Sequence, residues 1–186
     1  MTLFEREDDA HRFLRVLPLR LGKFGLRLNT HKTHLLAFGK QGAWQALQTG
    51  HRPATVDYLG FTHYWGRSRN GLVRVKRKTS KKRLRRALRD LTQWLRQERH
   101  ARKLPDLWQA MARKMRGHFN YFGVTDNSRA LSRCERTVPH RLCKWLNRRS
   151  QRRSFTWESF CRYRAQHPLP RLGPVISMSP VGGKPI

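Results

Sequence analysis

The feature that most constrains the fold is a leucine repeat that runs through the most basic stretch of the chain. Between residues 75 and 86, VKRKTSKKRLRR places eight cationic side chains among twelve positions and includes no acidic residue. Leucines recur through this stretch and beyond it at steps of four, three and four residues, at Leu84, Leu88, Leu91 and Leu95. That spacing is typical of one apolar helix face, with Thr79 or Ser80 as the N-cap. The basic run is therefore predicted to be the solvent face of a packed helix, not a free polycationic tail.

The charge balance of the chain points to an anionic partner. The 186 residues hold 41 Lys and Arg against 11 Asp and Glu, a formal net charge of +30, and such an excess repels itself in a compact state unless a polyanion neutralises it. Residues 74–103 carry fourteen Lys and Arg against Asp90 and Glu98 alone, whereas an inert solvated surface usually mixes both signs. Nucleic acid fits best, because its phosphates release counterions on binding. A membrane fits less well, since no lipid-anchor motif is present.

The composition predicts a soluble cytoplasmic protein with a hydrophobic core, because 38% of the residues are apolar and 10% aromatic. No apolar run approaches the roughly eighteen residues of a membrane span, and no signal peptide is expected. Cys134, Cys143 and Cys161 form no CxxC pair, which predicts reduced thiols and no zinc site. His31 and His34 have no thiol or carboxylate beside them, so neither a metal ion nor a cofactor is expected.

The first fifty residues are predicted to contain one helix followed by short extended segments. Apolar residues at helical spacing predict a helix over residues 8–24, with Asp8 as its cap and Pro18 as a kink. GLRLN and HLLAF are predicted to be extended, and KQGAWQALQTGHRP is predicted to be a loop.

A β-hairpin is predicted from Val56 to Lys76. VDYLGFTHYW is rich in β-branched and aromatic residues, and an Asn70–Gly71 turn separates it from LVRVK. Alternation along the second strand is expected to place Arg74 and Lys76 on one face of the hairpin. Val73 and Val75 are expected on the opposite face.

The rest of the chain is predicted to be helical. Pro105 opens a helix that ends at Gly123, and Phe119 and Phe122 are expected to pack in the core. A third helix carries an apolar series, Leu131, Cys134, Val138, Leu142, Trp145 and Leu146. TWESFCRYRAQ predicts a short amphipathic helix. The fold class expected from these elements is α+β.

Three sequence blocks in a fixed order resemble a known family. KFGLRLNTHKTHLLAFG, DYLGFTHYWGRSRNGLVRVKRKTSKKRLR and MRGHFNYFGVTDNSRALS resemble the second half of a group II intron-encoded reverse transcriptase and maturase, over about residues 4–170. The combination is specific, whereas GLRLN with KT alone is a weak signal. In that family the first block closes the palm, the second leads through a hairpin into the thumb, and the third belongs to the maturase domain that grips intron RNA.

The resemblance implies a domain organisation. A truncated palm end with the β-hairpin is expected at residues 1–76, a helical thumb and maturase-specific domain at 77–166, and a disordered tail at 167–186. Strands of an incomplete palm have no partners on one edge. We therefore expect the first 75 residues to pack less tightly than the helical half.

The resemblance also directs attention to a missing catalytic motif. Polymerase chemistry in this family needs a Tyr-Ala-Asp-Asp turn and a third carboxylate that together hold two divalent cations, and the sequence contains no such turn. Asp8 and Asp9 follow FERE and open a helix, so capping explains them better. The paired CxxC ligands of the family's endonuclease are also absent. We expect no catalytic residue, no metal site and no independent enzymatic activity, in a chain that starts downstream of the catalytic turn.

Carried onto this sequence, the resemblance implies a surface of RNA-binding side chains. The thumb-like part offers phosphate contacts that position RNA without reading its sequence, at Lys76, Arg77, Lys78, Lys81, Lys82, Arg83, Arg85 and Arg86. The maturase-like block offers backbone contacts at Arg113, Lys114, Arg116 and His118, and base contacts at Asn120 and Tyr121.

Two functions follow as hypotheses. The first is an RNA-binding fragment that binds group II intron RNA, with DNA as a further partner within a ribonucleoprotein, and that assists splicing without a polymerase site. The alternative is part of an RNA-directed DNA polymerase that is active only when another chain supplies the fingers and the rest of the palm.

Overall fold

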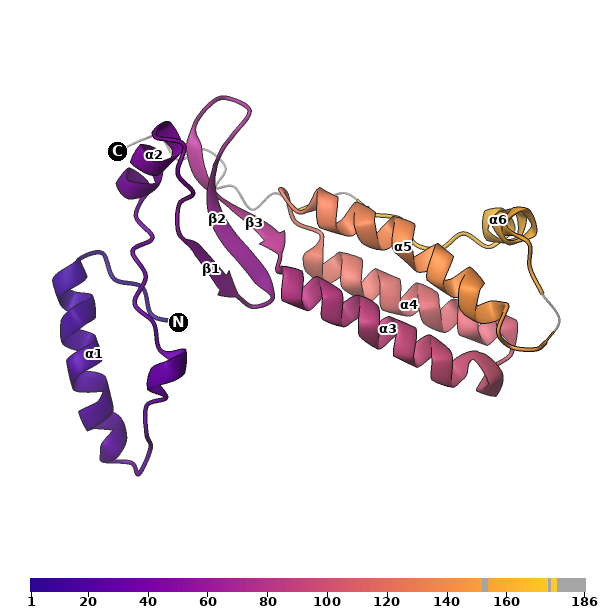
Figure 1. Ribbon diagram of the computed structural model, residues 1–186, viewed down its shortest axis with the longest axis horizontal. Helices are drawn as coiled ribbons and strands as arrows, with labels where there is room; N and C mark the ends of the chain where they lie inside the picture. Colours follow the sequence, from indigo (N-terminus) through magenta and orange to yellow (C-terminus); the bar gives the residue numbers. More distant parts are fainter. Residues whose placement is uncertain (152–153, 174, 177–186) are drawn as a thin grey trace.

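The computed structural model describes residues 1–151, 154–173 and 175–176. In chain order, a helical N-terminal part leads into a three-stranded antiparallel sheet, and the sheet leads into a bundle of helices (Figure 1). The predicted α+β class is confirmed. Among the described residues, no helix combines the length and the apolar character that crossing a bilayer requires.

The N-terminal part differs in detail from the sequence predictions. Helix α1 spans Glu7–Gly22 with Pro18 inside it, but its N-cap is Arg6 and no side chain caps it, so the predicted Asp8 cap is wrong. Asp8 lies in the first turn, where a carboxylate favours the positive end of the helix dipole. A 3-10 turn, η1, spans Thr30–Lys32. The segments on both sides of η1, which were predicted to be extended, form no strand.

A second helix, α2, spans Lys40–Gln48 in the segment predicted to be a loop. The loop prediction was wrong because Ala43 is the one position of this helix that becomes buried, so the sequence shows no apolar stripe. Across residues 1–78, which are all described, Ala10 and Ala43 are the only buried residues. Several large apolar side chains of this part are more than half exposed: Leu19, Phe24, Leu26, Leu36 and Trp44. The expected loose packing of the N-terminal part agrees with this exposure.

The sheet contains strands β1 (Thr55–Tyr58), β2 (Phe61–Arg67) and β3 (Val73–Thr79) in the order β1-β2-β3. The predicted hairpin is β2–β3, with Gly71 at φ +76° in its turn. The single strand predicted over residues 56–65 is instead two strands, because Leu59 and Gly60 both adopt positive φ and form a tight turn.

Strand β3 runs into helix α3 (Lys81–Ala101) with Ser80 as the only residue between them. The Ser80 side chain accepts a hydrogen bond from the Arg83 backbone N–H at 3.3 Å. The predicted cap and helix are therefore confirmed.

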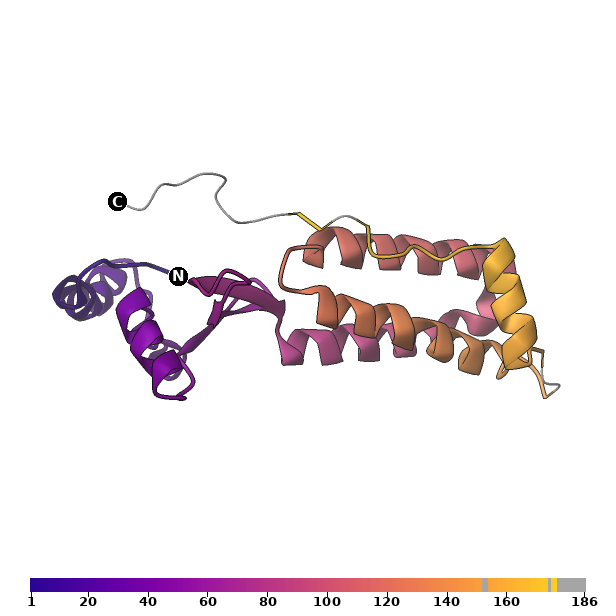
Figure 2. The ribbon, with the colours of Figure 1, turned by 90° about the horizontal axis from the view of Figure 1, so that it is seen from above.

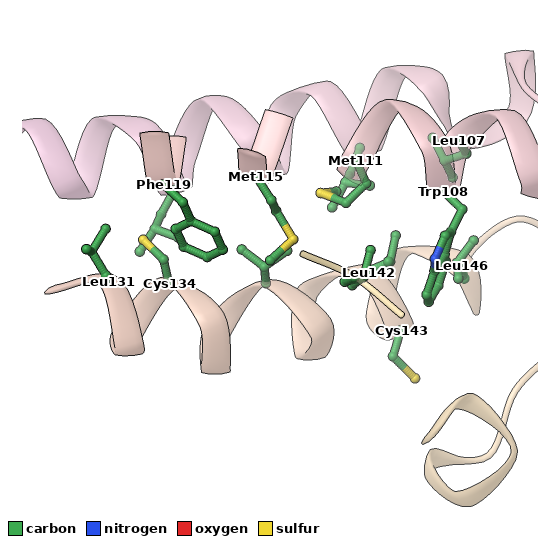
Figure 3. Close-up of a cluster of buried hydrophobic side chains, with 14 of the residues drawn as sticks. Leu107, Trp108, Met111, Met115, Phe119, Leu131, Cys134, Leu142, Cys143 and Leu146 are labelled. Atoms are coloured by element: carbon green, nitrogen blue, oxygen red, sulfur yellow. The ribbon is translucent and has the colours of Figure 1, made fainter. Parts of the chain in front are cut away.

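Helices α3, α4 (Leu104–Phe122) and α5 (Ser128–Leu146) form the bundle (Figures 1 and 2). Leu84, Leu88 and Leu95 of α3 are buried, as the leucine repeat predicts, and Leu91 is partly buried. Figure 3 shows the α4 side chains of Met111, Met115 and Phe119 facing α5. Opposite them lie side chains of α5, including Leu131, Cys134 and Leu142.

Helix α6 (Trp157–Gln166) closes the end of the bundle farthest from the sheet, and the chain then runs back along the bundle (Figures 1 and 2). Within the stretch predicted to be a disordered tail, Leu169 is buried in the core. The backbone N–H of Ile176 donates to the Gly123 carbonyl at 2.8 Å. Residues 174 and 177–186 of that stretch lie outside the described residues.

Candidate nucleic-acid interface

A concave surface rich in cations lies where the sheet meets the start of α3. This basic groove has a volume of about 770 Å³ and is lined by Thr55, Asp57, Thr62, Lys78, Lys81, Lys82, Arg85, Arg86 and Arg89. Five of the predicted phosphate contacts therefore share one surface: Lys78, Lys81, Lys82, Arg85 and Arg86.

Two kinds of secondary structure bring the groove residues together. On the sheet, Asp57 of β1 is opposite Thr62 of β2, and Thr62 is opposite Lys78 of β3, so these side chains form one row across the strands. On α3, Lys81, Arg85 and Arg89 recur at steps of four, and Lys82 and Arg86 form a parallel row beside them, so all five share one helix face. Because only Ser80 separates β3 from α3, the row and the helix face are adjacent.

The start of α3 has an unbalanced electrostatic arrangement. Its first turn has no acidic residue and instead holds three cations, Lys81, Lys82 and Arg83. Cations at this end of a helix oppose the helix dipole, whereas an anion is favoured there. A bound anion near this turn would reduce both the repulsion among the three cations and their unfavourable interaction with the helix dipole.

Carboxylates neutralise only part of the groove. Asp90 lies 3.8 Å from Arg86 and 3.9 Å from Arg89, and these exposed pairs are weak. Asp57 accepts a hydrogen bond from the Thr62 hydroxyl. The other four cations of the groove form no ion pair with any described residue: Lys78, Lys81, Lys82 and Arg85.

Lys78 is held in place by an aromatic ring. Its Nζ atom lies 4.5 Å from the centroid of the Tyr64 ring, a cation–π geometry. Burial, and then the nearby Asp126 charge, raise the pKa of Tyr64, so the phenol stays neutral. The ring restricts Lys78 without neutralising its charge.

Three predicted phosphate contacts near the groove do not line it. Lys76 Nζ lies 3.7 Å from an Asp126 oxygen. Alternation along β3 turns Arg77 to the opposite face of the sheet. Arg83 lies on the side of α3 that faces Gly60, with its Cγ close to that glycine.

The predicted contacts on α4 occupy different surroundings. Arg113, Arg116 and Asn120 are exposed on one helix face, whereas Lys114 Nζ lies 4.9 Å from the Trp94 ring centroid. Tyr121 is 54% exposed, and its hydroxyl donates to the Leu59 carbonyl at 2.9 Å. None of these residues lines the basic groove.

His118 is partly buried between the helices of the bundle. It lines an apolar cavity of about 220 Å³ between α3, α4 and α5, and its Nε2 atom lies 3.4 Å from Cys134 Sγ. Burial, and then the Arg83 charge, lower the pKa of His118, while burial raises the pKa of Cys134 to about 11. Both groups are therefore neutral near pH 7. Phe119 and Phe122, predicted to be core residues, are buried beside them.

Cys134, Cys143 and Cys161 are free thiols, of which Cys134 and Cys143 are buried. Within the described part of the chain, no group of three His, Cys, Asp or Glu side chains could hold a metal ion.

One basic surface was missed in the sequence. Helix α5 carries exposed basic side chains at steps of four, three, four and four residues, Arg129, Arg133, Arg136, His140 and Lys144. These residues lie along one face, here called the α5 stripe. The same period analysis that found the leucines of α3 would have found them. Arg89 of the groove was also missed, although it continues the spacing of Lys82, Arg85 and Arg86.

Comparison with known proteins gives one match. Residues 81–163 match the family model described as the group II intron, maturase-specific domain. No curated protein and no solved structure matches the chain significantly. The match begins at the first residue of α3 and ends within α6, so it includes the helical side of the basic groove. Over residues 81–163 the match therefore supports the resemblance to the C-terminal maturase part of a group II intron protein.

Proposed function

We propose that this chain binds group II intron RNA through the basic groove and assists splicing as a maturase. The observation that carries the proposal is the groove itself, where six cations from β3 and α3 converge on one concavity. Four of them have no carboxylate partner among the described residues. Phosphate neutralisation by such side chains is the main source of affinity for nucleic acids.

The groove chemistry favours recognition of the RNA backbone. Its polar residues besides the cations are Thr55, Asp57 and Thr62, and none of the described residues that line it has an aromatic side chain to stack on a base. Contacts of this kind position RNA without reading its sequence. We therefore propose that selectivity for the intron comes from the shape of the folded RNA and from contacts outside the groove.

We further propose that the chain acts without a polymerase site of its own, in the cytoplasm. The printed sequence contains no Tyr-Ala-Asp-Asp turn. Asp8 and Asp9, the one Asp–Asp pair in the sequence, lie in the first turn of α1 and are exposed. A pair at a helix start favours the dipole and does not form the strand-turn-strand carboxylate site of a polymerase.

A binding assay with a charge-matched control tests the proposal. Structured intron RNA and an unrelated RNA of equal length are titrated with the wild-type chain and with a groove variant carrying Lys81→Glu, Lys82→Glu, Arg85→Glu and Arg86→Glu. The control variant changes four exposed cations of the N-terminal part to Glu: Arg12, Arg15, Arg20 and Lys23. Tighter binding to the intron RNA, lost in the groove variant and kept in the control, supports the proposal. Equal losses in both variants would assign binding to net charge alone and reject the groove.

The exposed apolar side chains of the N-terminal part favour the second candidate, a chain that completes an RNA-directed DNA polymerase. Leu19 and Phe24 of this part are 72% and 73% exposed, and exposed apolar side chains gathered in one region mark interaction surfaces. Primer extension by the purified chain, alone and mixed with a fingers-and-palm polypeptide, tests this role. Extension only in the mixture, lost with Phe24→Asp, supports it; no extension in either sample rejects it.

A further inference from the structure

A second concave surface lies between α5, α6 and the segment after α6, residues 168–171, that runs back along the bundle. This aromatic pocket has a volume of about 520 Å³, and its lining includes Arg136, His140, Trp157, Arg164, Pro168 and Arg171. None of these residues belongs to the basic groove or to the predicted RNA contacts. A concavity of this size can accommodate one nucleotide.

Two parallel rings form one wall of the aromatic pocket. The rings of Trp157 and His140 lie 4.4 Å apart between centroids and are inclined by only 2°. Trp157 also stacks on Phe160, at 5.5 Å and 22°. Phe160 is fully buried, whereas Trp157 remains 42% exposed. A core aromatic residue thus supports a stack whose outer members, Trp157 and His140, are both exposed to solvent.

Cations surround the stack. Arg136, Arg164 and Arg171 line the pocket, and Glu135 is the one carboxylate among the described residues that line it. None of the three arginines forms an ion pair with a described residue. Guanidinium groups bind phosphate and also stack on flat rings, so both parts of a nucleotide would find complementary groups here.

The pocket is preorganised by the packing of the chain after α6. Trp108 Nε1 donates to the His167 carbonyl at 3.0 Å, and Leu169 is buried in the bundle core. Pro168 and Pro170 restrict the backbone on either side of Leu169. The Thr156 hydroxyl caps α6 by accepting from the Ser159 N–H at 3.2 Å, which fixes the start of the helix that carries Trp157.

The α5 stripe leads from the sheet end of the bundle into this pocket. Arg129, Arg133 and Arg136 lie on one face, and Arg136 belongs to both the stripe and the pocket lining. The rise from Arg129 to His140 is about 16 Å at 1.5 Å per residue. An RNA strand that follows the stripe would reach the rings of the pocket within a few nucleotides.

We infer that the aromatic pocket takes up an unpaired base of single-stranded RNA, which stacks on the Trp157–His140 pair while the arginines contact its neighbouring phosphates. This inference rests on the proposed function, since it adds a base contact to an RNA-binding protein. An acidic peptide could use the arginines, but the open parallel rings match a nucleobase better, because every base has a flat face that stacks on an aromatic side chain.

Two short RNAs separate base stacking from phosphate contact. One is a single-stranded RNA of about twelve nucleotides, and the other has the same backbone but abasic sugars throughout. Binding of both to the full chain is compared for wild type, Trp157→Ala and Trp157→Phe. Trp44→Ala is the matched control, because Trp44 lies on α2 and is 51% exposed.

Trp157→Ala is expected to weaken binding of the normal RNA by about 5- to 30-fold and to leave binding of the abasic RNA unchanged. Trp157→Phe should restore most of the affinity, and Trp44→Ala should have no effect. Equal affinity of wild type and Trp157→Ala for the normal RNA overturns the inference, as does an equal loss for both RNAs. Displacement of the normal RNA by an acidic peptide, with no difference between normal and abasic RNA, would assign the pocket to peptides and also overturn it.

The groove variant keeps this test separate from the proposed function. If the groove variant binds the normal RNA like wild type while Trp157→Ala does not, the groove proposal fails and the pocket stands. If the groove variant loses binding and Trp157→Ala retains it, the pocket fails and the groove stands.

Discussion

The side chain of Asn127 joins the start of α5 to Thr79, the last residue of β3. Its amide oxygen accepts from the Thr79 backbone N–H at 2.7 Å, and its amide nitrogen lies 2.8 Å from the Thr79 hydroxyl oxygen. Asn127 is 1% exposed and occupies the N-cap position of α5, yet it does not cap its own helix. The bonds instead fix α5 beside the strand that leads into α3.

Replacing Asn127 with Ala should lower the free energy of unfolding by about 2–4 kcal/mol. The change removes its bonds to Thr79 and its 2.9 Å bond to the Phe122 carbonyl, and leaves buried polar groups without these partners. Urea unfolding followed by circular dichroism measures the loss. Asn120→Ala is the control, because Asn120 is exposed on α4, and it should change stability by less than about 0.5 kcal/mol.

The salt dependence of RNA binding should report the phosphates held in the basic groove. If five phosphates are neutralised on a single strand, the logarithm of affinity should fall with the logarithm of salt concentration at a slope of about −3.5, since each contributes about 0.7. Lys82→Gln should make the slope shallower by about 0.7. Titrations at several salt concentrations measure it, with Lys23→Gln on the N-terminal side as a charge-matched control. A slope that is the same in both variants would argue against phosphate contact by Lys82.

Stability should decrease when the pH falls below the ordinary pKa of histidine, 6.5. The folded protein holds His118 at a lowered pKa because it is buried and because Arg83 is nearby. Between the two pKa values the unfolded chain binds a proton that the folded chain excludes, so folding is weakened there and is unaffected by His118 above pH 6.5. Chemical unfolding from pH 7.5 to 5 should show this decline, and it should be smaller in His118→Gln. An unchanged decline in that variant would assign it to other groups.

Two glycines of the α4 region should respond in opposite directions to the same substitution. Gly123 ends α4, and a Cβ atom there would overlap the backbone oxygen of Phe119, so Gly123→Ala should destabilise the fold by about 1–3 kcal/mol. Gly117 lies inside α4 with no atom near the position of a Cβ. Gly117→Ala should therefore stabilise the fold by about 0.5–1 kcal/mol. Thermal unfolding of both variants checks the pair, and a change of the same sign in both would contradict this account.

The helical half could be predicted because its sequence carries local signals that agree with tertiary packing. The leucines of α3, the Ser80 cap, Pro105 at the start of α4 and Gly123 at its end each act within a few residues. Packing of the same apolar faces then stabilises the bundle, so local and tertiary preferences coincide.

The N-terminal half was harder to predict because its segments have weak or conflicting local signals. Leu59 adopts φ 49° in the turn between β1 and β2, a conformation that a bulky side chain rarely takes. The segment that forms α2 contains Gly42 and buries only Ala43, so no periodic apolar pattern marks it. Leu26 was expected in a strand, but it is 57% exposed and pairs with no described strand.

The binding surface was only partly predictable, because its members come together through the tertiary fold. The cations of α3 were visible as a run in the sequence. The row from Asp57 through Thr62 to Lys78 depends on strand register, and the pairing of His140 with Trp157 depends on how α6 packs against α5. Neither can be read from spacing along the chain.

The single-residue connection from β3 through Ser80 into α3 fixes the rotation of the cationic helix about its own axis. Adding one residue at that junction would turn α3 by about 100° and swing its arginines away from the strands, even though every strand pair stayed intact. The number of residues between β3 and α3 therefore decides whether the cations of α3 face the strands, and the groove depends on it as well as on the charges.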